Sequence, residues 1–179
     1  MTTLNRLAAM IVIPLLAGPA VAAESPLTSL PRHVALDAHR HASGQPSAEA
    51  LAQLPAAGIT TVIDLRPDQE TPELDEKSVA TSAGLKYRAL PIAGVADLTR
   101  ENVARFDQLL KETAAENVLI HCASGNRVGA MLALQARWVQ GRSAEEALAI
   151  GKAAGMTGLA ADVQKLLDAP APPQQSPAR

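Results

Sequence analysis

The sequence has few aromatic residues and almost no cysteine. Its 179 residues include one Phe, one Tyr and one Trp, at Phe106, Tyr87 and Trp138. The core must therefore be built from Ala, Leu, Val and Ile, which argues against a deep pocket lined by aromatic rings. The single cysteine, Cys122, cannot form a disulfide within the chain. It is therefore either a buried apolar residue or a functional thiol.

The chain also lacks a strong excess of charge of either sign. It carries 16 Lys and Arg against 18 Asp and Glu, a formal net charge of −2. No run of like charge stands out, so nothing favours nucleic acid or an anionic membrane surface as a partner. The sequence leaves the oligomeric state open.

The N-terminus has the layout of a cleavable signal peptide. Arg6 precedes an uncharged apolar run over residues 7–20, and small residues suited to cleavage follow. The run is shorter than the roughly 18 residues that a membrane span needs, and a proline and a glycine interrupt it. We expect residues 1–23 to be a signal peptide rather than an uncleaved anchor. The protein would then be exported, to the periplasm in a bacterium, without stable membrane insertion.

Apolar, β-branched runs alternate with helical patterns through the rest of the chain. This alternation predicts one α/β domain over residues 24–169, with a mainly parallel central sheet flanked by helices. Residues 170–179 are rich in Pro and Gln and are predicted to be a disordered tail. Strands are expected at 33–36, 59–65, 85–92 and 117–121, and helices at 47–56, 73–83, from 99 onward, 127–140, 143–154 and 157–169.

A loop of unusual composition joins the last predicted strand to the helix at 127–140. It begins with His121-Cys122, continues with the small residues Ala123-Ser124-Gly125, and ends with Asn126-Arg127. Small side chains let backbone N–H groups turn inward beside a helix N-terminus, which favours negative charge and stabilises a thiolate. The Arg127 guanidinium offers a bidentate fork to a tetrahedral oxyanion. The loop therefore predicts a nucleophile at Cys122, a phosphate cradle over 123–127 and a clamp at Arg127.

Two residues of this loop have competing interpretations. Cys122 could be a buried, inert thiol, although the strand-to-helix position favours a functional one. His121 either tunes the thiol or is a core histidine whose polar atoms are satisfied, and the sequence does not separate the two.

The loop resembles the His-Cys-x-x-Gly-x-Arg signature of the bacterial beta-lactamase-hydrolase-like phosphatases, relatives of the dual-specificity and tyrosine phosphatases. The similarity extends to the turn at 43–47, to residues 61–66 and to residues 87–92, and it covers roughly residues 33–140. The resemblance implies a dual-specificity-phosphatase-like fold and a substrate that is a phosphorylated small molecule or protein.

The resemblance also implies a two-step mechanism that needs no metal or cofactor. Cys122 would form a cysteinyl-phosphate, held by Arg127 and the loop amides, and water would release phosphate. The general acid is expected in the loop after the strand at 85–92, where Asp97 is the candidate carboxylate and Glu101 a substitute. Asp97 could equally be a first-turn residue favoured by the helix dipole. Asp64 and Arg66, at another strand end, are expected to be a structural pair that braces the loop.

Two departures from the phosphatase pattern keep other functions open. Four residues separate Cys122 from Arg127 where most relatives have five, and Val128 stands where they carry a hydroxyl that helps turnover. The four-residue spacing and the Asp64-x-Arg66 element also resemble rhodanese-like sulfurtransferases, which carry a persulfide. A non-catalytic phosphate-binding module is the third possibility. His121 before the cysteine and the turn at 44–46 favour the phosphatase.

Overall fold

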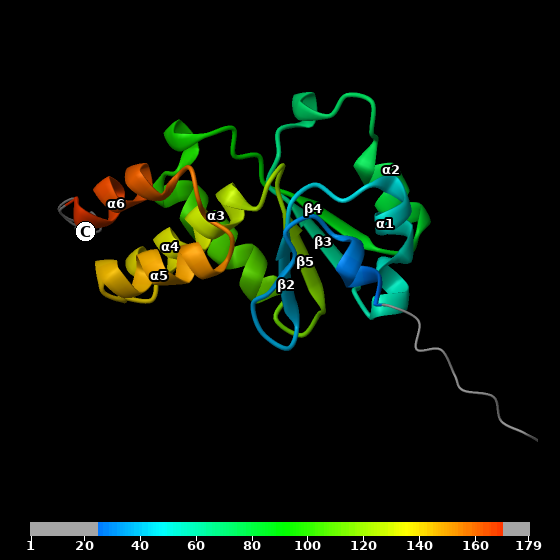
Figure 1. Cartoon of the computed structure of the whole chain (residues 1–179), viewed down its shortest axis with the longest axis horizontal. Coiled ribbons are helices and arrows are strands. Elements are labelled where there is room, and N and C mark those ends of the chain that lie inside the picture. The colour runs from blue at the N-terminus through cyan, green and yellow to red at the C-terminus, as the bar shows by residue number, and fades with distance from the viewer. Residues whose placement is uncertain (1–24, 170–179) are drawn as a thin grey trace, which may run out of the picture.

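A computed structural model describes residues 25–169, so the expected signal peptide and tail lie outside the described residues. A five-stranded sheet runs through the centre in the order β1-β2-β5-β3-β4 (Figure 1). Strands β2, β5, β3 and β4 are mutually parallel, and β1 is antiparallel to β2. The predicted α/β class with a mainly parallel sheet is confirmed. The strands are β1 Val34–Ala35, β2 Arg40–Ser43, β3 Thr61–Asp64, β4 Lys86–Ala89 and β5 Val118–His121.

The sequence analysis missed strand β2. Its four residues, Arg-His-Ala-Ser, carry no apolar run, so no strand pattern is visible there. The strand exists because its backbone pairs in parallel with β5, where Ala42 lies beside Ile120 and Ser43 beside His121. This pairing decides what lies beside the cysteine loop, since the chain leaves β2 at Ser43 directly alongside the end of β5.

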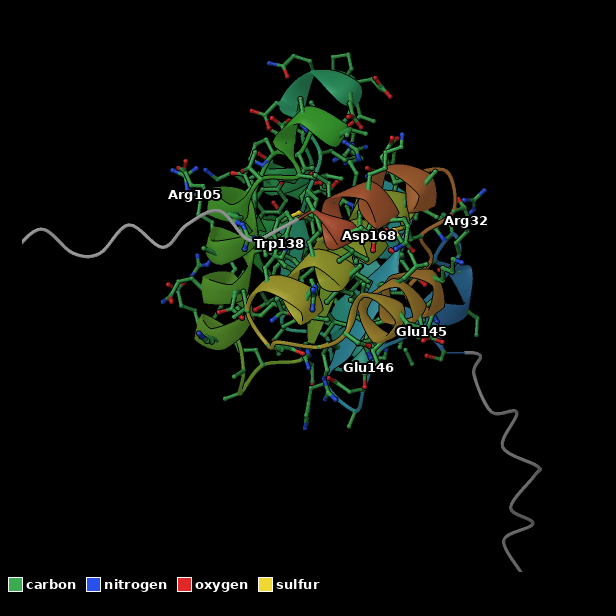
Figure 2. All side chains as sticks on the ribbon, turned by 90° about the vertical axis from the view of Figure 1, so that its left-hand side faces the viewer. Arg32, Arg105, Trp138, Glu145, Glu146 and Asp168 are labelled. Atoms are coloured by element: carbon green, nitrogen blue, oxygen red, sulfur yellow. The ribbon has the colours of Figure 1, made fainter. Side chains whose placement is uncertain are left out.

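Helices cover both faces of the sheet (Figure 1). Alternating side chains of β3 and β5 divide the core: Val62 and Leu119 pack toward α1 and α2, whereas Ile63 and Ile120 pack toward the larger helical layer. Figure 2 looks onto that layer, with Glu145 and Glu146 on α5 and Asp168 on α6. The helices are α1 Ala48–Gln53, α2 Glu76–Ser82, α3 Arg100–Glu112, α4 Asn126–Trp138, α5 Ala144–Ala153 and α6 Ala160–Asp168.

Capping residues set where these helices begin. Ser143 forms a complete capping box with Glu146 at α5, and the hydroxyl of Thr99 accepts from the backbone N–H of Asn102 at α3. The predicted helix at 73–83 is shorter in the structure. Asp75 caps its first turn by accepting from the N–H of Ser78, so α2 begins only at Glu76.

The crossing of α4 and α5 fixes the helix that begins at the cysteine loop. A Cβ atom on Gly129 of α4 would overlap the carbonyl oxygen of Gly151 on α5. The two backbones thus approach as closely as they do only because both residues are glycine. Among the described helices, none is both long and apolar enough to cross a bilayer.

Candidate active site

The cysteine loop joins the carboxyl end of β5 to the N-terminus of α4. Cys122 follows β5 directly and is fully buried. Gly125 has φ +81° and is the N-cap residue of α4, a conformation that glycine adopts without strain. The first N–H groups of a helix have no acceptor within it, so those at residues 125–128 are free of intrahelical partners. The cradle over residues 123–127 stays a prediction, and the loop that would form it lies between β5 and α4 as expected.

Neighbouring segments hold the loop carbonyls. The backbone N–H of Gln45 donates to the oxygen of Ala123 at 3.1 Å. The guanidinium of Arg32 donates to the oxygen of Ser124 at 3.4 Å. Arg32 has φ +52° and is the one non-glycine residue with positive φ in the chain's described part. Two carbonyls of the loop are thus engaged by the segment around β1 and β2, a role for Arg32 and Gln45 that no sequence pattern indicated.

Arg127 is held in place before any ligand arrives. Its two terminal nitrogens each donate to a different carboxylate oxygen of Glu70, both at 2.6 Å, and one also donates to the carbonyl oxygen of Ile92 at 2.7 Å. Burial works against the charge of Arg127, but hydrogen bonding to Glu70 and the facing Cys122 sulfur outweigh it, so its pKa is raised. The guanidinium is therefore a permanent cation between Glu70 and the thiol.

Glu70 and Ile92 reach Arg127 from the ends of two other strands. Glu70 lies in the short 3-10 turn Asp68–Glu70 that follows β3. After β4, the backbone N–H of Leu90 donates to the carbonyl oxygen of Asp64, and that of Ile92 donates to the carbonyl oxygen of Leu65, each at 2.9 Å. These bonds keep the segment after β4 beside the end of β3. The sequence analysis missed Glu70, because its distance from Arg127 along the chain leaves no periodic signal. Its place after a strand end was the one available clue.

Asn126 uses its side chain to organise the loop from outside. Its amide oxygen accepts from the backbone N–H groups of Thr157 at 2.9 Å and Leu159 at 3.2 Å. These bonds hold the connection between α5 and α6 against the cysteine loop. The amide oxygen of Asn126 is therefore used to hold this connection.

Asp97 lies at the end of the 3-10 turn Val95–Asp97 in the loop after β4. One carboxylate oxygen accepts from the backbone N–H of Ala93 at 2.7 Å, and its carbonyl accepts from the side chain of Asn102. The carboxylate is thus engaged within its own loop. Its partner, Ala93, directly follows Ile92, whose carbonyl oxygen accepts from Arg127. Glu101 lies farther along, on α3, where its exposed side chain pairs with Arg105 at 3.5 Å.

His121 belongs to a buried ionic cluster of its own. Its Nε2 lies 2.6 Å from a carboxylate oxygen of Glu76 and 3.7 Å from one of Asp64. Arg66 binds both acids, at 2.8 Å to Asp64 and 2.5 Å to Glu76. Alternation along β5 turns His121 toward the α1 and α2 face and Cys122 toward the other face. The histidine therefore does not contact the thiol through its ring; Glu76 is the partner that the sequence analysis missed.

The surroundings of Asp64 explain the pKa shifts of this carboxyl group and of the neighbouring Tyr87. Burial would raise the pKa of Asp64, but the charge of His121 and the hydrogen bonds from Arg66 outweigh it and lower that pKa. Tyr87 donates to Asp64 at 2.9 Å, and burial together with that carboxylate raises the pKa of the phenol far above its ordinary value. Asp64, Glu76 and His121 have possible metal-ligand atoms within 4.8 Å of one another. However, Arg66 already binds both carboxylates, so the donor set fits an internal ion network better than a metal centre.

Comparison with known proteins identifies the family. Residues 33–168 match the family described as DSP-PTPase phosphatase fused to NAD+ kinase. The chain belongs to this phosphatase family. A beta-lactamase hydrolase-like protein of Xylella fastidiosa (strain Temecula1) is 33% identical over 118 residues. That match covers 63% of this chain but only 27% of the relative.

Solved phosphatase structures share the fold. A candidate phosphatase from Neisseria meningitidis Z2491 is 29% identical, with a TM-score of 0.59, and covers 75% of this chain and 95% of its own. The active form of Tk-PTP superposes with a TM-score of 0.60 at 23% identity, over 77% of this chain and 97% of its own. Pseudomonas aeruginosa TpbA, solved as a cysteine-to-serine variant in complex with pTyr, has a TM-score of 0.54 at 20% identity, over 82% and 93% of the two chains. The fold of this phosphatase-family chain is thus that of dual-specificity-type enzymes.

Proposed function

We propose that the chain hydrolyses phosphomonoesters, in the manner of tyrosine and dual-specificity phosphatases, through a cysteinyl-phosphate on Cys122. The observation that carries this proposal is the placement of the Arg127 guanidinium against Cys122 at the N-terminus of α4. A thiolate, a cation fixed by Glu70 and inward N–H groups together fit a phosphoryl group, whose charge is spread over three equatorial oxygens.

The chemistry takes two displacements at phosphorus. The Cys122 sulfur attacks, the sulfur–phosphorus bond forms, and the bond to the leaving oxygen breaks as that oxygen receives a proton from Asp97. Water then attacks the phosphorus as the Asp97 carboxylate takes a proton from it, the sulfur–phosphorus bond breaks, and inorganic phosphate leaves with Cys122 again a thiolate and Asp97 again protonated. Arg127 and the N–H groups of 123–127 stabilise the equatorial oxygens in both steps. Val128 offers no hydroxyl to the departing thiolate, so we expect the second step to limit the rate.

The role of Asp97 requires its carboxyl group to exchange the N–H of Ala93 for the leaving oxygen. Asp97→Asn should lower kcat/KM on phenyl phosphate, which reports the first step, about 10²-fold or more, and it should lower kcat/KM far less on p-nitrophenyl phosphate, whose leaving group needs no proton. Glu101→Gln is the matched control, since its exposed side chain pairs only with Arg105. Equal losses on the two substrates would assign the acid to another group.

The decisive experiment uses Cys122→Ser. Hydrolysis of p-nitrophenyl phosphate by the wild type should disappear in this variant, while ³¹P NMR of the rapidly quenched wild type should show a phosphothioester. Thiosulfate:cyanide transfer without phosphate release would instead assign the chain to the sulfurtransferases, with a persulfide on Cys122. Vanadate binding without turnover would leave a phosphate-binding module.

The substrate class follows from the scarcity of rings. Phe106 is fully buried and so lines no phosphotyrosine slot, and the hydroxyl of Tyr87 is engaged with Asp64. We therefore propose that the enzyme accepts varied phosphoesters. Comparable kcat/KM values on phosphoserine and phosphotyrosine peptides would support this, and strict selectivity for phosphotyrosine would contradict it.

Export is proposed from the residues before 24. Expression of the full chain in a bacterium should yield a periplasmic protein that begins near Ala23 or Glu24, as N-terminal sequencing would show. An intact N-terminus in the cytosolic fraction would reject the proposal.

A further inference from the structure

Two histidines contact each other across the hairpin formed by β1 and β2. His33 directly precedes β1, and the register pairs Ala35 with His41, which places His33 diagonally across from His41. The Nε2 atom of His33 lies 3.0 Å from the Nδ1 atom of His41, and the two ring planes differ by 25°. Both side chains are half-buried. The proposed phosphatase chemistry uses neither of them.

Both imidazoles are neutral at pH 7. Burial lowers the pKa of each ring below its ordinary value, and the neighbouring His41 lowers that of His33 further. The other ionisable group that acts on the pair is Asp37, whose charge offsets only part of the effect of burial on His41. One of the two facing nitrogens therefore carries a hydrogen and the other a lone pair. Because each ring has a second nitrogen that can carry its proton, both facing nitrogens can present lone pairs without any net loss of protons.

The separation of the two facing nitrogens favours one kind of metal ion. Nitrogens 3.0 Å apart that each lie about 2.0–2.1 Å from one ion subtend an angle of about 95° at that ion. This angle is closer to the roughly 90° of a tetragonal Cu²⁺ site than to the roughly 109° of the tetrahedral sites that Zn²⁺ prefers. Cu²⁺ is also the divalent ion of the first transition row that nitrogen ligands bind most tightly.

We propose that His33 and His41 form a binding site for Cu²⁺ on the β1–β2 hairpin, with water completing the coordination. The carboxylate of Asp37 is not a third ligand, because one oxygen accepts from the side chain of Arg40 at 2.7 Å and the other from the backbone N–H of His39 at 2.9 Å. Its negative charge nevertheless favours a cation beside His41.

A metal ion bound there would cross-link two strands that border the cysteine loop. Arg32, the residue before His33, donates to the carbonyl oxygen of Ser124 and lies at the margin of the molecule in Figure 2. Beyond β2, the backbone N–H of Gln45 donates to the carbonyl oxygen of Ala123. The bound ion would therefore stabilise the two segments that engage this loop. The proposal does not depend on the chemistry that the loop performs.

The test adds Cu²⁺ to the full chain carrying Cys122→Ser, so that the thiol neither binds nor reduces the ion. At pH 7.5, EPR spectra should show one tetragonal Cu²⁺ per chain, and pulsed EPR should show two coordinated imidazoles. His33→Gln and His41→Gln should each weaken binding about tenfold or more, because each removes one of the two protein ligands. His39→Gln is the matched control: this third histidine of the same hairpin bonds to Asn117, and its replacement should leave the affinity unchanged.

Acidification should release the ion, because a protonated imidazole is not a ligand. Since the pKa of both rings is lowered, this release should occur below about pH 6.5. One coordinated imidazole instead of two, or undiminished binding in His33→Gln, overturns the proposal. Loss of binding in His39→Gln also overturns it, since another pair of histidines would then hold the ion. Should a variant fail to fold, paramagnetic broadening of amide NMR signals in the Cys122→Ser chain still locates the ion, and broadening centred away from residues 33–41 rejects the site.

Discussion

Two buried arginines, Arg66 and Arg127, both donate hydrogen bonds to carboxylates, but they differ in the N–H groups that remain for a ligand. Arg66 is surrounded by the buried acids Asp64 and Glu76, and its remaining terminal nitrogen donates to Thr71. Arg127 has one acidic partner, Glu70, whose side chain is 31% exposed, and it also faces the thiol. Arg66 donates four of its five N–H groups to protein acceptors, so it keeps no two-donor edge for a ligand. Arg127 donates three and keeps the edge formed by Nε and one hydrogen of Nη2. The comparison teaches that burial and pairing alone do not separate a structural arginine from a candidate catalytic one; an open donor edge beside the proposed nucleophile does.

The comparison predicts its largest effect, a loss of activity, at Arg127. Arg127→Lys keeps the charge but loses the planar fork, so kcat/KM for p-nitrophenyl phosphate should fall about 10³-fold or more. The free energy of unfolding should change much less, as urea denaturation would measure. An activity within tenfold of the wild type would mean that Arg127 does not clamp the phosphoryl group.

Arg66 should show the reverse pattern. Arg66→Met leaves Asp64 and Glu76 as buried acids with one cation fewer, which should cost about 3 kcal/mol of stability. Urea unfolding of Arg66→Met and of Arg88→Met, a cation on β4 outside this cluster, gives the contrast. Equal stability in the two variants would contradict the structural role of Arg66.

A smaller loss of activity is expected at Glu70 than at Arg127. Glu70→Gln keeps the shape but weakens both hydrogen bonds to Arg127, so kcat/KM should fall about tenfold through loss of orientation. Asp68→Asn, in the same short turn, should be nearly neutral because it does not contact the clamp. A rise in activity in Glu70→Gln would show that the carboxylate competes with substrate for Arg127.

The smallest effect is the acid dependence of stability that Asp64 confers. Its pKa in the folded state lies below the ordinary value, so the stabilisation is complete above the pKa of the unfolded chain. It is lost as the pH falls through the lower pKa of the folded state, that is, below about pH 4. The difference in unfolding free energy between the wild type and Asp64→Asn should therefore shrink from pH 6 toward pH 3. If this difference in unfolding free energy grew on acidification, the pKa of Asp64 would be raised in the folded state rather than lowered.

The strongest sequence predictions rested on local features. The alternation of apolar runs gave the α/β class, and Ser143 and Thr99 marked helix starts that the structure retains. The loop from His121 to Arg127 was found because its small residues, its glycine and its position after a strand are consecutive in the chain. Predicted boundaries differed where a capping residue competed, as at Asp75.

The partners of that loop were beyond sequence reasoning. Strand β2 lacks an apolar pattern and is formed by pairing with β5, and Glu70 reaches Arg127 from 57 residues away. Glu76 is likewise distant from His121 in the chain and resembles a surface acid in the first turn of a helix. Such contacts are set when distant strand ends converge at one edge of the sheet.

The sequence by itself determined the α/β pattern and the order of the proposed nucleophile, cradle and arginine, because each depends on neighbouring residues and their periodicity. Only the tertiary structure decided which acid holds Arg127, which acid binds His121, and that His121 and Cys122 face opposite sides of the sheet. The physical reason is that the energy of a buried charge depends on every charge and hydrogen bond around it, and chain folding alone brings those groups together.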